Sequence, residues 1–142
     1  MRRNEALAEA VKMYYQEDAV VMYIEAQEAG LSGAELLADP AAVMRDCNGI
    51  GAAWMSNWAR NLCNQLSPVM VLPAAIHDRR YAIGGQPGQL YADNEFLVNC
   101  LTMIERRYGW WNPLRYIMRH RAQRYYSYLR TFGAIAYGGQ QA

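Results

Sequence analysis

The chain has 142 residues, about half of them apolar, and a formal net charge of +1. A chain of this size buries roughly two-thirds of its unfolded surface, so we predict a single domain over residues 1–142. Its three cysteines are an odd number without framework spacing, which argues against a disulfide scaffold and predicts reduced thiols and folding in the cytosol. No apolar run reaches the ~18 residues that a membrane span requires.

Charge is unevenly distributed along the chain. Residues 1–46 carry nine acids against four bases, whereas residues 105–130 carry seven arginines against the single Glu105. This asymmetry is typical of two ends that pair with each other, or of a basic face that meets phosphate groups. The basic start of the chain is followed by acids rather than by an apolar run, so we expect no signal peptide and synthesis in the cytoplasm.

Helical periodicity runs through the chain and predicts an all-α fold. Residues 4–29 form the first expected helix, and Gly30 offers its stop. The Ser-Gly-Ala-Glu sequence of residues 32–35 is a capping-box pattern that opens a short helix, and Asp-Pro opens another over residues 39–45. Further segments with apolar residues three or four apart predict helices over 52–66, 73–83, 91–108 and 113–131.

A loop is expected directly after the third of these helices. The sequence Asp46-Cys47-Asn48-Gly49-Ile50-Gly51 places two glycines and an asparagine within four residues. Such a composition favours unusual backbone dihedrals, which can turn several carbonyls toward one point. We therefore predict a loop over residues 46–51 with the capacity to surround a ligand.

The helix over 73–83 carries the residues best suited to proton chemistry. On it His77 and Tyr81 are four positions apart and share a face, while Asp78 lies about a quarter-turn away. A short turn at Gly84 to Gly88 favours an antiparallel neighbour, which would bring Asp93, in the first turn of the next helix, back beside His77.

The arginine-rich helix over 113–131 shows an apolar stripe made of Leu114, Ile117, Met118, Ala122, Tyr125, Leu129 and Phe132. Arg115, Arg119 and Arg130 fall on the opposite side. Arg121 falls inside the stripe, where an unpaired charge would be costly, so it needs an acidic partner or an edge that reaches water.

Three interpretations of these arginines remain open at this point. They can pair with the acidic N-terminal helices, or they can meet anionic lipid headgroups with Trp110 and Trp111 at the interface. The third interpretation is nucleic acid, against which the near-zero net charge and the lack of a recognition motif argue.

The pattern of these residues suggests hydrolysis. A histidine held by an aspartate can deprotonate water, because the carboxylate fixes the imidazole tautomer and stabilises its charged form. Asp78 and the carbonyls of the 46–51 loop together form a plausible calcium site, because calcium prefers carboxylate and carbonyl oxygens. A cation there would polarise an ester carbonyl.

The order of a glycine-bearing loop, His77-Asp-x-x-Tyr81 on a helix and Asp93 early in the next helix resembles the phospholipase A2 superfamily. The Asn48-Gly-x-Gly loop, Ile76-His-Asp and Ala92-Asp-x-x-Phe96 are most similar to its short, disulfide-poor bacterial and phage-type members. The resemblance covers residues 46–105 and, more weakly, the segment to about residue 138.

This resemblance implies a phospholipase A2-like helical core over 47–108, preceded by an N-terminal helical extension (1–46) and followed by a basic, aromatic C-terminal part (109–142). It implies calcium-dependent hydrolysis of the sn-2 ester of glycerophospholipids at an interfacial, non-spanning membrane contact. His77 would be the general base, with Asp93 as its orienting partner and Tyr81 bonded to the Asp93 carboxylate. The implied calcium ligands are the Asp78 side chain and the carbonyls of Cys47, Gly49 and Gly51.

Each of these residues also has a structural explanation. Asp93 would stabilise the dipole of its helix as an N-terminal acid, Cys47 would be a small buried thiol, and His77 would be a hydrogen-bonded core group. A fold hosts unrelated tasks, so the alternative function is a non-catalytic structural or interaction protein, such as a phage virion component, that docks a protein partner through residues 4–46. Because cytosolic calcium is scarce, an enzyme of this kind would act outside the producing cell, after non-classical export or within a virion.

Overall fold

The computed structural model describes residues 19–47, 68–135 and 137. Within these residues the secondary structure is helical and contains no strand, which confirms the expected all-α class. In chain order the elements are a helical segment over 19–28, the 3-10 helix η1 (Ala34–Leu37), α2 (Pro40–Cys47), the 3-10 helix η4 (Pro68–Met70), α4 (Val71–Ile83), α5 (Gln89–Arg107), α6 (Pro113–Phe132) and the 3-10 helix η5 (Gly133–Ile135).

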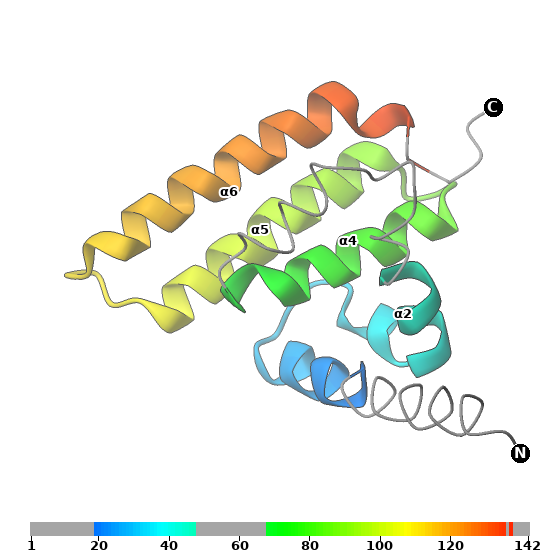
Figure 1. Ribbon diagram of the computed structural model, residues 1–142, viewed down its shortest axis with the longest axis horizontal. Helices are drawn as coiled ribbons and strands as arrows, with labels where there is room; N and C mark the ends of the chain where they lie inside the picture. The colour runs from blue at the N-terminus through cyan, green and yellow to red at the C-terminus, as the bar shows by residue number, and fades with distance from the viewer. Residues whose placement is uncertain (1–18, 48–67, 136, 138–142) are drawn as a thin grey trace, which may run out of the picture.

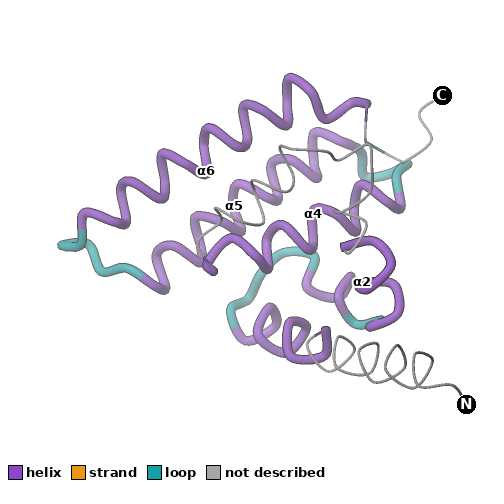
Figure 2. The backbone as a smooth tube through the Cα atoms, in the orientation of Figure 1, coloured by secondary structure: helices purple, strands orange, loops and turns teal. Residues whose placement is uncertain are grey.

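Helices α4, α5 and α6 form an antiparallel layer with α5 in the middle (Figure 1). Two short connections join them, shown as teal segments of the tube in Figure 2. The expected antiparallel arrangement of the helices that carry His77 and Asp93 is therefore confirmed. The N-terminal segments and α2 pack against α4, on the side away from α6 (Figure 1).

The helix ends follow from local sequence. Helix α4 ends at Gly84, whose φ of 67° is costly for residues with a side chain and whose N–H bonds the Arg80 carbonyl at 3.0 Å. At the start of α6, Pro113 occupies the first turn and the Asn112 side chain accepts the Leu114 N–H at 3.0 Å. These two caps limit α4 and α6, and they set the positions of the residues that face α5.

Two apolar clusters lie on either side of α4. The first joins α4 to the N-terminal segments, and the second joins α4 and η4 to α5 and α6. Their buried members are Ala19, Ala26, Leu31, Ala34, Leu37, Val43, Leu72, Ala75 and Ile76 in the first, and Val69, Met70, Ala74, Phe96, Cys100, Ile104, Met118, Ala122 and Leu129 in the second. Helix α4 is thus packed on two sides, which fixes the orientation of the polar residues that it carries.

Several local predictions are corrected by the structure. Ser32 does not cap the following 3-10 helix, because its hydroxyl donates to Glu95 instead and the N-cap is Gly33. Asp46 and Cys47 are not loop residues, since α2 continues through Cys47. In α6 the buried stripe is narrower than the apolar pattern suggests: Met118, Ala122 and Leu129 are buried, whereas Leu114, Ile117 and Phe132 are exposed.

Other predictions lie outside the described residues. The helix over 52–66, the glycines Gly49 and Gly51 of the expected loop, and the first part of the 4–29 helix belong to this group. Cys100 is a free thiol and is fully buried in the second cluster. Among the described helices, none has the length and apolar character needed to cross a membrane.

Candidate active site

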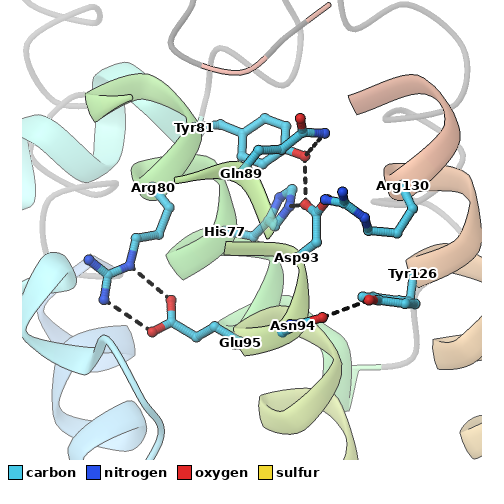
Figure 3. Close-up of polar contacts among 9 residues, drawn as sticks. All are labelled: His77, Arg80, Tyr81, Gln89, Asp93, Asn94, Glu95, Tyr126 and Arg130. Atoms are coloured by element: carbon cyan, nitrogen blue, oxygen red, sulfur yellow. Dashed lines mark hydrogen bonds and ion pairs between the residues drawn. The ribbon is translucent and has the colours of Figure 1, made fainter. Parts of the chain in front are cut away.

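The Asp93 carboxylate is the centre of a buried polar constellation between α4, α5 and α6. Its side chain is 0% exposed and accepts hydrogen bonds from three residues (Figure 3). His77 Nε2 lies 2.9 Å from Oδ1 and the Tyr81 hydroxyl lies 2.5 Å from the same oxygen. Arg130 Nη1 donates to Oδ2 at 2.7 Å. Both carboxylate oxygens are therefore engaged, which fixes the group in one orientation.

The structure places Asp93 in the second turn of α5 rather than the first, because the helix begins at Gln89. Its carboxylate bonds side chains of two other helices. The interpretation of Asp93 as a helix N-terminal acid is therefore wrong. The prediction that Asp93 lies beside His77 and Tyr81 is correct, because the hairpin folds α5 back along α4.

The imidazole of His77 is held by aromatic rings as well as by Asp93. Its ring centroid lies 4.1 Å from that of Tyr81 and 5.3 Å from that of Phe96. Tyr137 packs edge-on against Tyr81 at 5.2 Å, and its hydroxyl donates to the Gly85 carbonyl at 2.5 Å. His77 is only 5% exposed. A ring enclosed in this way cannot change orientation without repacking its neighbours.

Electrostatics define the protonation states of this group. Burial raises the pKa of Asp93, but the hydrogen bonds from His77, Tyr81 and Arg130 outweigh it and the net pKa is lowered. Burial, and then the bond to Asp93, raise the pKa of Tyr81, so the phenol stays protonated and donates. An ionised carboxylate can only accept, so the hydrogen between His77 and Asp93 belongs to Nε2. In the neutral ring, Nδ1 is then the nitrogen with a free lone pair.

Arg130 is the member of the constellation that the sequence pattern missed. Helical phase assigned it to the solvent side of α6 together with Arg115 and Arg119. The structure instead shows it at the end of the helix, where a long side chain reaches sideways to Asp93. Arg121 is exposed, as the edge alternative required. Nothing in the sequence around Arg130 predicts that its side chain contacts Asp93.

Gly133 directly follows α6 and leaves the room that Tyr81 uses. A Cβ at this position would contact the Tyr81 hydroxyl and would lie 2.9 Å from Gln89 Nε2. Gln89 itself lies 3.4 Å from the Tyr81 oxygen. The end of α6 thus supplies both the arginine and the space that the Tyr81–Asp93 bond needs.

Asp78, one residue after His77, differs from every other described carboxylate. Its Oδ2 is buried and has no hydrogen-bond partner among the described residues. Burial raises its pKa well above the usual range, and the nearby charge of Asp46 adds to the effect. Asp46 is held by Arg45 and Arg79 and does not pair with Asp78. A buried carboxylate oxygen without a donor is suited to receive a cation.

The predicted calcium ligands are only partly placed by the structure. Asp78 lies on α4 with the unpartnered oxygen described above, and Cys47 is the last residue of α2, which packs against α4. Gly49 and Gly51 lie outside the described residues. In the described part of the chain, no three His, Cys, Asp or Glu side chains form a group that could hold a metal. A site here would need backbone carbonyls in addition to Asp78.

A second buried polar network lies on another side of α5. The Glu95 carboxylate receives a two-bond contact from Arg80, at 3.0 and 3.1 Å, and the Ser32 hydroxyl at 2.7 Å. Asn99, one turn further on, bonds both the N–H and the carbonyl of Ser32. Gly33, with a φ of 81°, passes so close that a Cβ would lie 3.0 Å from the Glu95 carboxylate. This network ties the segment before η1 to α5.

The arginines of α6 do not pair with the acidic N-terminal part among the described residues. The ion pairs of this helix join Arg115 to Glu105 and Arg130 to Asp93, both on α5. Residues 19–47 pack on the far side of α4 from α6 (Figure 1). Within the described residues, ion pairs with the acidic N-terminal part therefore do not explain the arginine-rich face of α6.

Comparisons with protein-family models, with curated proteins and with solved structures give no match for this chain. The geometry of the site is accordingly what supports any functional assignment.

Proposed function

We propose that this protein is a calcium-dependent hydrolase of the sn-2 ester of glycerophospholipids, similar to phospholipase A2. The observation that carries the proposal is the pairing of a buried His77–Asp93 dyad with Asp78, one residue away, whose buried Oδ2 has no hydrogen-bond partner in the described part of the chain. A histidine in a core needs only a hydrogen-bond partner. It does not need a neighbouring buried carboxylate oxygen that lacks a donor among the described residues; an unsatisfied buried polar group costs about 1–3 kcal/mol.

In the proposed mechanism His77 acts as general base. Its Nε2–H is held by Asp93, so the lone pair on Nδ1 accepts a proton from the attacking water. The resulting imidazolium is stabilised by the Asp93 carboxylate. The same proton is then available to the leaving oxygen of the glycerol backbone. Tyr81 keeps the dyad in this geometry because its hydroxyl donates to the oxygen that His77 also bonds.

Arg130 has a distinct role in this proposal. With His77 and Tyr81, which have the larger effects, its bond to Asp93 Oδ2 lowers the pKa of the carboxyl. It also leaves Oδ1 for His77 and Tyr81. It acts through Asp93 and is therefore a positioning residue. The guanidinium also balances the charge of a carboxylate that is completely buried, which would otherwise be expensive.

Calcium takes carboxylate and carbonyl oxygens. Asp78 supports a calcium site here, because its buried Oδ2 has no donor among the residues that the structure describes. Asp78 would supply the side-chain ligand, and the carbonyls of Cys47, Gly49 and Gly51 would complete the set. When bound, calcium supplies polarisation of the ester carbonyl and stabilisation of the oxyanion.

Calorimetric calcium titration on wild type and Asp78→Asn tests this proposal, with phospholipid hydrolysis in mixed micelles followed on the same samples. We expect calcium binding and calcium-dependent release of the sn-2 fatty acid in wild type, and loss of both in the variant. Glu105→Gln is the matched control, because it removes one acid at the other end of α5. Wild type that binds no calcium and releases no fatty acid would refute the proposal.

A non-catalytic structural or interaction protein, for example in a phage virion, is the second candidate. It is favoured by the low exposure of His77 and by three exposed aliphatic residues on the 19–28 helix, namely Val20, Val21 and Ile24. These would form part of a docking face for a protein partner within residues 4–46. A stable complex that Val21→Ser with Ile24→Ser abolishes, from a chain without hydrolytic activity, would support this candidate.

A further inference from the structure

The connection between α5 and α6 forms a projecting structure that we call the tip, residues 106–117. It is the outer end of the hairpin at the left of Figure 1. Its backbone is ordered by local bonds: Asn112 N–H donates to the Gly109 carbonyl at 2.9 Å, and the Tyr116 hydroxyl donates to the Trp110 carbonyl at 2.8 Å. Trp111 lies over Gly109, where a Cβ would come 2.6 Å from the indole nitrogen. The tip therefore presents its side chains from a defined backbone.

The tip exposes large apolar side chains in an unusual concentration. Trp110 is 76% exposed and Trp111 is 71% exposed, although tryptophan is among the residues most buried on average. Leu114 and Ile117, on the first two turns of α6, are also exposed and lie three residues apart on one side of the helix. An exposed group of two indoles and two aliphatic chains marks an interaction surface.

The charge around these side chains is mainly positive, and the neighbouring acid, Glu105, is paired with Arg115. Arg106 and Arg107 end α5 at the tip and are exposed, and Arg121 is exposed one turn beyond Ile117. None of these three has an acidic partner among the described residues, and the sequence contains no aspartate or glutamate after Glu105. The surface to which the tip is complementary must therefore be anionic.

We propose that the tip is a docking site for an anionic phospholipid bilayer. Tryptophan is favoured at the membrane–water interface because its ring is apolar and its N–H remains hydrated. Arginines near an anionic lipid surface contribute about 1 kcal/mol each. Leu114 and Ile117 add two exposed aliphatic side chains close to the indoles in the chain. The combination matches an interfacial anchor, which buries apolar side chains beneath a basic rim.

Other occupants match this surface less well. A second copy of the chain would bring two arginine-rich tips together, which like charges oppose. Nucleic acid would use the arginines and could stack on the indoles, but it has no use for two exposed aliphatic chains. A lipid surface uses the charges, the indoles and the aliphatic chains at once.

This docking does not rest on the proposed hydrolysis, and it occurs at a separate place. Arg107 and Asp93 are both on α5, about 20 Å apart along the helix axis. The tip would thus attach the protein to a membrane without involving His77 or Asp78. His77→Asn should bind vesicles as wild type does. A wild type that binds vesicles but hydrolyses no phospholipid would remove the proposed function and leave this inference standing.

The test is vesicle flotation in EDTA, which excludes any contribution of calcium. We expect wild type to bind vesicles of equimolar phosphatidylglycerol and phosphatidylcholine, to bind pure phosphatidylcholine much more weakly, and to be released by salt. Arg106→Gln with Arg107→Gln should lower partitioning roughly thirtyfold. Trp110→Ala with Trp111→Ala should lower it roughly tenfold or more. Ile135→Ser, an exposed aliphatic position at the other end of α6, is the matched control and should bind normally.

The wild-type protein alone can overturn the inference, so the test survives a variant that fails to fold. Equal binding to neutral and anionic vesicles, or binding that salt leaves unchanged, contradicts it. Equal loss of binding in Ile135→Ser and in the tip variants also contradicts it. Binding of duplex DNA that the two arginine substitutions abolish, without any vesicle binding, would assign the tip to nucleic acid instead.

Discussion

Asp93 and Glu95 are two buried carboxylates on α5, two residues apart, and each binds an arginine from a neighbouring helix. They leave the helix on nearly opposite sides. Glu95 accepts hydrogen bonds from Arg80, which is permanently charged, and from the Ser32 hydroxyl, which does not titrate. Asp93 holds an imidazole and a phenol in addition to its arginine. The two environments share burial and an arginine, and they differ in the presence of a group that can exchange a proton.

The difference shows what separates a structural ion pair from a candidate catalytic site. Buried carboxylate–arginine pairs occur wherever two segments must be tied together, and Glu95 does this for the segment before η1. A histidine beside a carboxylate can act as a general base, because the carboxylate fixes its tautomer and stabilises its charged form. Substitution of Asp93 should therefore affect activity far more than the matched substitution of Glu95.

The largest difference is expected in activity. Asp93→Asn should lower the rate of sn-2 ester hydrolysis by about three to four orders of magnitude, because an amide no longer fixes the imidazole tautomer or stabilises the imidazolium. Glu95→Gln, the matched substitution, should leave kcat within a few-fold of wild type, since Glu95 has no contact with His77. Rates measured in calcium on folded protein decide this. Equal losses in the two variants would mean that Asp93 has no special chemical role.

Stability should depend strongly on the Glu95 network. Glu95→Ala leaves Arg80 in a largely buried position without its partner and removes the acceptor of the Ser32 hydroxyl. We expect a loss of about 3 kcal/mol in the free energy of unfolding, measured by urea denaturation. The neighbouring Asn94→Ala is the control and should cost less, because the Asn94 side chain accepts from the Tyr126 hydroxyl on an exposed side. An unchanged midpoint in Glu95→Ala would contradict the structural role of the network.

The smallest effect concerns pH and Asp78. An acid whose folded-state pKa is raised holds its proton after the unfolded chain has lost it, so stability falls as pH rises from about 4 to the folded pKa. Asp78→Asn removes this cost. Without calcium the variant should be more stable than wild type at pH 7, by about 1–3 kcal/mol, and equal to it below pH 4.

Asp93 has the opposite effect on the pH dependence of stability. Its folded-state pKa is lowered, so its contribution to stability is present above about pH 4 and is lost as pH falls through the folded value. Thermal melts of wild type and Asp78→Asn across pH 3–8 in EDTA separate the two contributions. A variant that is less stable than wild type at pH 7 would show that Asp78 has a donor in the folded protein.

Much of the central arrangement could be predicted from local sequence. Gly84 and the short turn after it fixed the end of α4 and its hairpin with α5, and helical spacing then placed His77, Tyr81 and Asp93 together. These predictions succeed because they depend on residues within one hairpin, where spacing along the chain determines spacing in three dimensions.

Two of the contacts that sequence reasoning missed join distant segments. Arg130 lies 37 positions from Asp93, and Ser32 lies 63 positions from Glu95, so no periodicity connects them. Ser32 matched a capping box, but the buried carboxylate of Glu95 competes for its hydroxyl and wins. In α6 the apolar pattern predicted a wider buried face than the structure has, because sequence alone cannot distinguish a stripe that packs from one left exposed.

The most direct measurement is the release of fatty acid from phospholipids labelled separately at the sn-1 and sn-2 positions, comparing wild type with His77→Asn in calcium and in EDTA. We predict release from the sn-2 position by wild type in calcium, and none in EDTA or from a folded His77→Asn variant. Turnover that persists in His77→Asn, or a wild type that releases no fatty acid while calcium is bound, would contradict the assignment of the His77–Asp93 dyad as a hydrolytic site.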